Sequence, residues 1–190
     1  MFDITEHDST APAPDDLEIL QRFLNLHEHD AEGTTLDPPL EMIRAFLVDR
    51  GLLAPEERFT GAHRETYLQL RRALRALIES GREPLTAEEA EVIDRLGVEA
   101  GLHPHFHAGH DPTLEPRGEG VAAAFGRIVA IAFVASFDGT FAHLKTCADE
   151  GCRAVFYDRS KNQSGRWCSM ADCGNRAKVR AWRERQKASR

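Results

Sequence analysis

The sequence predicts an α+β fold: a mostly helical N-terminal domain that contains a short hairpin, followed by a small cysteine-rich module. Three observations lead to this prediction. Apolar residues recur at helical spacing over the first hundred residues, a stretch near residue 105 alternates with period two, and all four cysteines fall within Cys147–Cys173. A chain of 190 residues, 42% of them hydrophobic, can form one such domain plus a small module.

Composition divides the chain into three segments. Residues 1–16 are rich in Asp, Thr, Ala and Pro, lack apolar periodicity and are predicted to be disordered. Residues 17–142 are predicted to form the helical domain. Residues 143–187 are predicted to form the cysteine-rich module.

Helical spacing and capping signals predict four helices in the first hundred residues. Leu17, Leu20 and Leu24 recur on one face and predict a helix over about 15–27. Thr86 and Glu89 have the spacing of a capping box, which predicts a helix start. Between these two we expect a helix that Asp37 caps, with Pro38 and Pro39 in its first turn and Gly51 in the left-handed position after it, and a helix along Tyr67–Ile78 that Gly81 closes.

The pattern changes after residue 100. Residues 101–117 predict one or two short strands, because Leu102–His107 alternates and prolines and glycines recur between Pro112 and Gly120. The most apolar stretch is Val121–Phe137, which ends at Asp138-Gly139. It is short for a membrane span and contains Arg127, so we interpret it as a buried helix. We therefore expect a soluble, cytoplasmic protein that does not enter a membrane.

The net charge of −7 conceals an asymmetry between the two ends of the chain. Residues 143–190 hold 12 Lys/Arg and 5 Asp/Glu, a net charge of +7, whereas residues 1–142 hold 12 Lys/Arg and 26 Asp/Glu, a net charge of −14. A basic end on an acidic body favours contact with a polyanion through the basic end. The alternative is a solvated basic tail.

The four cysteines have the pattern C-x4-C-x15-C-x4-C, which predicts one zinc site. Zinc prefers four tetrahedral ligands, and two close pairs separated by a loop supply them. Two disulfides are disfavoured in an intracellular chain, and a redox pair would be expected at C-x-x-C spacing. Four thiolates leave no position open for water, so a structural role is expected. The predicted ligands are Cys147, Cys152, Cys168 and Cys173.

The residues between the cysteines predict how the module folds. Gly151 can take positive φ in the turn between the first two ligands, and Arg153–Tyr157 is predicted to pair with a strand at Arg166–Cys168. Ser169 and Asp172 have capping-box spacing, so a helix is expected to begin there. A zinc knuckle, which is the turn between the first two ligands, followed by a hairpin and then a helix, indicates a treble-clef-like zinc finger. Phe156 and Trp167 are expected to form the small core that zinc completes.

The C-terminal helix carries the second functional signal. Arg176, Arg180, Arg183 and Lys187 share one helical face, and Arg suits both phosphates and guanine edges. The alternatives are a solvated helix end or an anchor for the acidic body. Two roles are open for Asn175, which can reach base edges or brace the zinc knuckle. The predicted nucleic-acid contacts are Asn175, Arg176, Lys178, Arg180, Arg183 and Lys187.

These residues resemble a known family. Trp167-Cys168-Ser169-Met170, followed by Cys173-Gly174-Asn175-Arg176-Ala177-Lys178-Val179, resembles the bacterial CGNR zinc-finger family, as do Phe156, Asp158, Ser160, Asn162 and Arg166. Leu24-Asn25, with Leu47 and Gly51-Leu52-Leu53, resembles the ABATE domain that usually precedes this finger. The family is described as stress-induced transcription regulators, so the resemblance implies control of transcription.

One histidine cluster lies outside this pattern. His103, His105 and His107 alternate and would share one face of a strand, with His110 nearby. Imidazoles on one face can bind Zn, Ni or Cu, but no carboxylate or cysteine joins them at close spacing in the sequence. We therefore expect a polar strand face without a metal. The sequence contains no Ser/His/Asp signature, phosphate-binding glycine loop or HExxH helix, so we predict no enzymatic activity and no catalytic residues.

The predicted function is that of a zinc-dependent, DNA-binding transcription regulator whose partner is double-stranded DNA. The alternative is a protein–protein or RNA-binding adaptor with a purely structural finger, and an enzyme that uses the histidine face comes third. Two further partners of the 17–142 domain are left open: a small-molecule ligand and a second copy of the chain.

Overall fold

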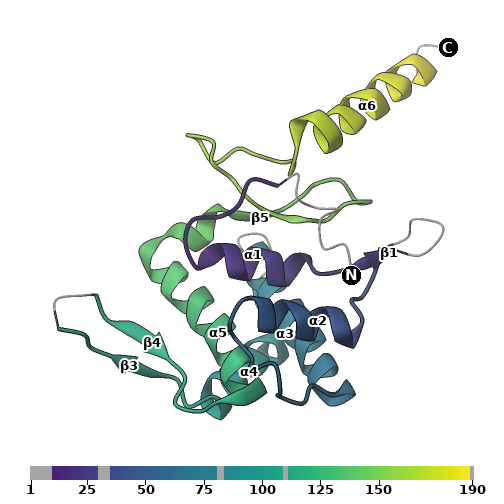
Figure 1. The fold of residues 1–190 in the computed structure, drawn as a ribbon. Coiled ribbons are helices and arrows are strands. Elements are labelled where there is room, and N and C mark those ends of the chain that lie inside the picture. The colour runs from purple at the N-terminus through teal and green to yellow at the C-terminus, as the bar shows by residue number, and fades with distance from the viewer. Residues whose placement is uncertain (1–9, 30–34, 81–83, 109–110, 189–190) are drawn as a thin grey trace.

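The computed structural model describes residues 10–29, 35–80, 84–108 and 111–188. Its N-terminal part is helical, and its C-terminal part is built of short strands, turns and one helix (Figure 1). The predicted α+β class is therefore confirmed. The helices are α1 (Leu17–Asn25), α2 (Leu40–Asp49), α3 (Gly61–Glu79), α4 (Ala87–Glu99), α5 (Gly120–Asp138) and α6 (Asn175–Ala188), with a 3-10 turn η2 (Thr140–His143) and a π turn η3 (Met170–Gly174).

The strands in the described part of the chain form three separate antiparallel pairs. The pair β3–β4 is the predicted hairpin, and it extends away from the helices (Figure 1). The pairs are β1 (Glu28–His29) with β2 (Thr35–Leu36), β3 (His103–His105) with β4 (Thr113–Glu115), and β5 (Leu144–Thr146) with β6 (Val155–Tyr157).

Helix α5 packs in the middle of the helical part, against α1, α3 and α4. By length and composition it is the one described helix that could cross a membrane, but more than half of its apolar window is buried within the protein. Its charged residue, Arg127, pairs with Asp16 at 2.9 Å. Gly126 permits close approach to α4, since a Cβ there would lie 2.2 Å from the Cβ of Ala100. These features are those of a buried core helix, as predicted.

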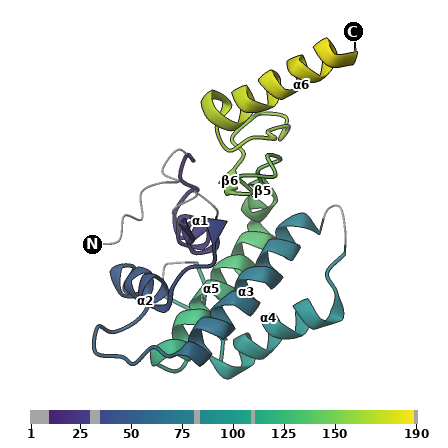
Figure 2. The ribbon, with the colours of Figure 1, turned by 90° about the vertical axis from the view of Figure 1, so that its right-hand side faces the viewer.

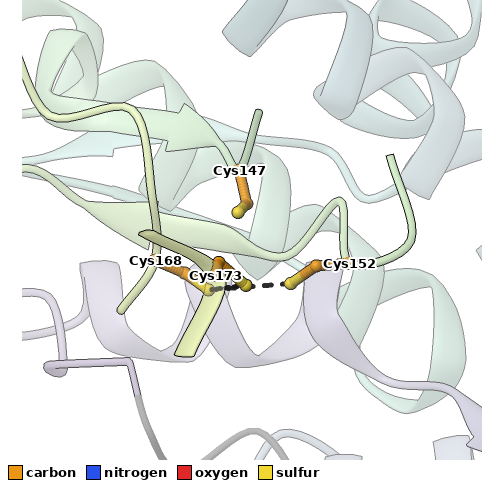
Figure 3. A group of neighbouring side chains, drawn as sticks. All are labelled: Cys147, Cys152, Cys168 and Cys173. Carbon is orange, nitrogen blue, oxygen red and sulfur yellow. Dashed lines mark hydrogen bonds between the residues drawn. The ribbon is translucent and has the colours of Figure 1, made fainter. Parts of the chain in front are cut away.

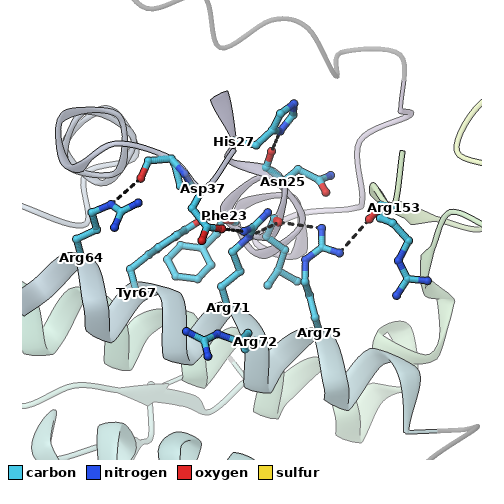
Figure 4. A network of polar contacts seen from close by, with 12 residues as sticks. Phe23, Asn25, His27, Asp37, Arg64, Tyr67, Arg71, Arg72, Arg75 and Arg153 are labelled. Atoms are coloured by element: carbon cyan, nitrogen blue, oxygen red, sulfur yellow. Dashed lines mark hydrogen bonds and ion pairs between the residues drawn. The ribbon is translucent and has the colours of Figure 1, made fainter. Parts of the chain in front are cut away.

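The C-terminal end of α1 is held by side chains from α3 (Figure 4). The Tyr67 hydroxyl donates to the carbonyl of Phe23 at 2.8 Å, and Arg71 and Arg75 donate to the carbonyl of Leu24 at 3.1 and 3.2 Å. The last carbonyls of a helix have no partner within the helix and carry partial negative charge, so a hydroxyl and two guanidinium groups suit them. Burial raises the pKa of Tyr67 well above its usual range, which keeps this hydroxyl protonated.

Most of the predicted helix signals are confirmed. Thr86 and Glu89 form the capping box of α4, with the Glu89 amide donating to the Thr86 hydroxyl at 3.2 Å. Gly51 and Gly139 adopt φ of +66° and +83° where α2 and α5 end. Gly81 lies outside the described residues.

Two predictions in the N-terminal part need correction. Asp37 does not cap α2, which starts after Pro39, because its carboxylate instead pairs with Arg71 at 3.0 Å. The predicted disorder of residues 1–16 does not extend over residues 10–16. There Ala13 is buried, and its amide donates to the side chain of Gln21 on α1 at 2.7 Å. Residues 1–9 lie outside the described part.

The cysteine-rich part is joined to the helical part by more than the chain. The side chain of Asn25 makes two hydrogen bonds of 2.7 Å to the amide and carbonyl of Val155, as a neighbouring strand would. Arg75 donates to the carbonyl of Arg153 at 2.9 Å. Leu144 and Val155 are buried in the main hydrophobic core, so the strands β5 and β6 share that core. Helix α6, in contrast, projects away from the body (Figures 1 and 2).

Candidate metal centre and nucleic-acid interface

The four cysteines converge on one point (Figure 3). Their sulfur atoms all lie within 4.8 Å of one another, with Cys168 Sγ at 3.6 Å from Cys152 Sγ and 3.5 Å from Cys173 Sγ. A zinc ion with Zn–S bonds of about 2.3 Å needs a tetrahedron of sulfurs about 3.8 Å apart. All four cysteines are free thiols, so no disulfide competes for them. The site therefore fits one structural zinc ion, as predicted.

The crowding and burial of the four thiols disfavour thiolates when no metal ion is bound. The hydrogen bond with Cys152 and burial raise the pKa of Cys168 far above its usual range, and burial raises that of Cys173 to about 12. A bound metal ion reverses this effect, because coordinated thiols are held deprotonated. The guanidinium of Arg176 also donates to Cys173 Sγ at 2.9 Å, which favours a thiolate there.

The knuckle between the first two ligands differs from the prediction in one detail. The positive φ falls on Arg153, at +52°, and not on Gly151. The turn forms because the carbonyl of Asp149 accepts from the amides of Cys152 and Arg153 at 2.8 and 3.0 Å. The helical part also holds the side chain of Arg153, since its guanidinium pairs with Glu79 of α3 at 2.7 Å.

The strand pairing also differs from the prediction. Val155–Tyr157 forms a strand, β6, but its partner is Leu144–Thr146 and not Arg166–Cys168. The latter segment forms one backbone hydrogen bond with the knuckle, from the Ala148 amide to the Arg166 carbonyl at 2.8 Å. The predicted small core is confirmed, since Phe156 is buried with the cysteines and Trp167 packs against it.

Asp149 ties the knuckle to α6. Its side chain is only 2% exposed, and it accepts from Arg176 Nε at 3.0 Å and from Arg180 Nη2 at 2.8 Å. The hydrogen bond from Arg180 and the one from Arg176 lower the pKa of Asp149, so the carboxylate stays charged. Two of the predicted nucleic-acid contacts therefore have a structural task, which is to fix the direction of α6 relative to the zinc site.

A second buried carboxylate, Asp158, organises the loop before the third ligand. It accepts from the Lys145 ammonium at 2.6 Å and from the amides of Ser160 and Gly165 at 2.9 and 2.8 Å. Burial acts to raise the pKa of Asp158, but these hydrogen bonds outweigh it and hold the pKa well below its usual range. Gly165 has no room for a side chain, because a Cβ there would lie 2.7 Å from the Asp158 carboxylate.

The exposed surface of α6 is strongly basic. The helix carries six Lys/Arg and one Glu, a net charge of +5. Arg183 and Lys187 continue the face of Arg176 and Arg180 beyond the knuckle, while Lys178 and Trp182 lie on the opposite side at 100° per residue. All four of these outer residues are exposed, and Trp182 is 56% exposed.

Asn175 does not take the bracing role that was open for it. Its side chain is exposed and makes no hydrogen bond with any residue that the structure describes. Arg176 and Arg180 brace the knuckle instead.

The histidines of β3 lie together as predicted, but a carboxylate joins them. His105 Nδ1 and His107 Nε2 lie 3.1 and 3.5 Å from the two carboxylate oxygens of Glu115 on β4. His103 stacks on His105 but stands outside this group. Sequence spacing could not reveal the group, because it depends on the register of the hairpin. His110 lies outside the described residues.

Comparison with known proteins addresses the C-terminal part of the chain. No curated protein matches the sequence. Residues 143–186 match the family model of the CGNR zinc finger. This range contains all four converging cysteines, the knuckle and nearly all of α6. The C-terminal part of the chain is therefore a CGNR zinc finger with a site for one structural zinc ion.

Proposed function

We propose that this protein is a cytoplasmic transcription regulator that binds double-stranded DNA through its zinc finger and has no enzymatic activity. The observation that carries the proposal is helix α6, which bears a net charge of +5 and projects from the body (Figures 1 and 2). Its first turns are braced through Asp149 to the zinc knuckle. A basic helix that is rigidly aimed can enter a groove of DNA, which a flexible basic tail cannot do with a fixed geometry.

The remainder of the molecule supports α6 as the contact surface. Residues 1–142 carry a net charge of −14, which repels a phosphate backbone. Lys178, Arg183 and Lys187 are exposed on α6, and they would contact phosphates. Asn175 is exposed at the N-terminal end of α6 and would be the residue that reaches base edges.

In this proposal Arg176 and Arg180 orient α6 and do not primarily contact DNA. Both bind Asp149, yet their side chains remain 56% and 55% exposed. Asp149 carries one negative charge and the two guanidinium groups carry two positive charges, so the three side chains together keep a net charge of +1. The contribution of both residues to DNA binding would therefore come mainly from aiming α6.

The helical part is proposed to be an ABATE domain that senses a stress signal. A cavity of about 680 Å³ opens between α3, α4 and α5, within the size range of small-molecule sites. Its lining is apolar except for Asp94 and Ser136, so its ligand would be a small apolar molecule with one or two polar groups. The bonds from Asn25 and Arg75 to β6 and to Arg153 would connect this domain to the finger.

The test of sensing uses a fluorescent apolar dye as the probe. We expect the full chain to bind one equivalent, and Gly97→Leu to prevent binding, since Gly97 lines the cavity and a Cβ there meets Leu102 only at 3.5 Å. Gly118→Leu is the control, because no atom lies within 4 Å of a Cβ at that position. Equal dye binding by the three proteins would remove the cavity from the proposal.

The test of DNA binding is fluorescence anisotropy with a labelled random duplex and the zinc-loaded full chain. We expect the triple variant Lys178→Ala, Arg183→Ala and Lys187→Ala to lose most of its affinity and to lower the salt slope by about 2.7, at about 0.9 for each phosphate contact. Glu184→Gln on the same helix is the control and should bind at least as well as the wild type. Zinc content is measured in each variant.

A second probe separates the proposal from its alternative. A labelled RNA hairpin of the same sequence and a duplex DNA are compared at equal salt. Preference for the RNA, or binding of neither, would favour an adaptor whose finger is purely structural.

A further inference from the structure

We propose that the β3–β4 hairpin holds a second metal site, for a divalent transition-metal ion such as Ni²⁺ or Zn²⁺, built from His105, His107 and Glu115. The site is independent of the zinc finger and of its proposed function. Sequence spacing alone did not indicate the site, because Glu115 lies ten residues after His105 along the chain.

Hairpin register supplies the carboxylate that the sequence spacing lacked. His103 pairs with Glu115 and His105 pairs with Thr113 across the two strands. Alternate residues of a strand share one face, so the side chains of His105, Thr113 and Glu115 lie together. His107 continues the same face just past β3, and its ring stacks on that of His105 with centroids 4.3 Å apart.

The separations between the donor atoms match those of ligands around one ion. With metal–ligand bonds of about 2.1 Å, neighbouring ligand atoms lie about 3.0 Å apart at about 90° and about 3.4 Å apart in a tetrahedron. His105 Nδ1 lies 3.1 Å from one oxygen of Glu115, and His107 Nε2 lies 3.5 Å from the other. All three residues offer a ligand atom within 4.8 Å of each of the others.

Thr113 holds the carboxylate in place. Its hydroxyl donates to Glu115 Oε1 at 2.6 Å and lies 2.9 Å from His107 Nε2. His105 Nδ1 lies 3.1 Å from the other oxygen, Oε2, so neighbouring side chains orient both oxygens of the carboxylate. Polar partners that orient a ligand in this way are typical of metal sites.

The donor set defines the class of ion. Two imidazoles and one carboxylate suit Zn²⁺, Ni²⁺, Cu²⁺ and Fe²⁺, whereas Mg²⁺ and Ca²⁺ prefer oxygen ligands alone. His105 and His107 are solvent-accessible, so an ion can reach the site and water can fill its remaining positions.

The test is isothermal titration of Ni²⁺ into the full chain after its cysteine site has been loaded with zinc. We expect one saturable equivalent of Ni²⁺ per chain, with no release of zinc. The double variant His105→Gln and His107→Gln should not bind this equivalent. Glu115→Gln should lower the affinity by about 100-fold, and Thr113→Val by about 10-fold, as loss of an outer-shell partner does.

His103→Gln is the matched control, because His103 shares the strand face but stands outside the ligand group. Its affinity for Ni²⁺ should equal that of the wild type. Circular dichroism confirms that each variant is folded. The proposal is overturned if the wild type binds no Ni²⁺ beyond its zinc, or if the double variant binds Ni²⁺ as tightly as the wild type.

Discussion

The helical body and the zinc finger differ in what their cores are made of. In the body, large apolar side chains such as Leu20, Phe23 and Leu74 are fully buried and pack on one another. The core of the finger has only three buried residues, Cys147, Phe156 and Cys173, and two buried carboxylates lie beside it. Burial of apolar area stabilises the body, whereas metal bonds and ion pairs to buried carboxylates stabilise the finger.

This difference predicts which changes destabilise each part. A small domain cannot bury enough apolar area to fold by that means alone, so the finger depends on its metal. The two parts nevertheless meet along β5 and β6, where Leu144 and Val155 belong to the core of the body. The comparison therefore predicts different responses to metal removal, to cavities and to the loss of polar contacts.

Removal of zinc should have the largest effect, and it should be confined at first to the finger. The apparent free energy of binding structural zinc is about 10–16 kcal/mol, and it is also folding energy. Cys173→Ser, or a chelator, should abolish the fixed environment of Trp167, which packs against the core of the finger, whereas Trp182, the other tryptophan of the chain, is exposed. Tryptophan fluorescence and elemental analysis measure this, with Glu150→Gln as the control. An unchanged tryptophan spectrum in the metal-free chain would refute the comparison.

A cavity in the body should have the next largest effect and should leave the metal in place. Leu20 is fully buried, so Leu20→Ala should lower the free energy of unfolding by about 2–5 kcal/mol. Urea denaturation followed by circular dichroism measures it. The zinc-to-protein ratio should remain at one, and a loss of zinc from this variant would show that the two parts fold as a single unit.

Loss of the carboxylate that ties the knuckle to α6 should have an intermediate effect. Asp149→Ala leaves Arg176 and Arg180 without their buried acceptor, and we expect a cost of about 1–3 kcal/mol to the finger. Tryptophan fluorescence during urea denaturation measures it. Glu150→Ala is the matched control, because Glu150 is the exposed neighbour. Equal midpoints for the two variants would remove Asp149 from the architecture of the finger.

Much of the fold depends on local signals. The period of the apolar residues predicts α1 and α3, and the apolar stretch Val121–Phe137 predicts α5. The spacing of the cysteines predicts the zinc site. All of these signals depend on residues that are near one another in the sequence. The capping box of Thr86 and Glu89 is local in the same way.

Contacts between distant segments could not be read from the sequence. Asn25 meets Val155 across 130 positions, and Glu115 meets His105 only because the hairpin adopts one register. The predicted pairing of β6 was wrong for the same reason, since Arg166–Cys168 and Leu144–Thr146 are both plausible partners by local pattern. Asp149 was overlooked because an acidic residue in a polar turn is usually solvated.

The smallest predicted effect concerns a single hydroxyl. Tyr67→Phe removes the donor to the carbonyl of Phe23 and should cost about 1 kcal/mol, because that carbonyl lies in a buried region. Tyr157→Phe on β6 is the control, since the Tyr157 hydroxyl has no hydrogen-bond partner in the described part of the chain, and its cost should be near zero. Thermal unfolding of the two variants measures the difference. A larger cost for Tyr157→Phe would contradict this assignment.

The most direct test of the central claim is duplex affinity as a function of salt. The zinc-loaded wild type is titrated into one labelled duplex at several salt concentrations, and the metal-free chain is titrated in parallel. We predict that log K falls linearly with log salt, with a slope at least as steep as about −2.7 from Lys178, Arg183 and Lys187, and that the metal-free chain binds far more weakly. If the zinc-loaded chain shows no salt-dependent affinity for any duplex, the finger does not bind DNA and its role is purely structural.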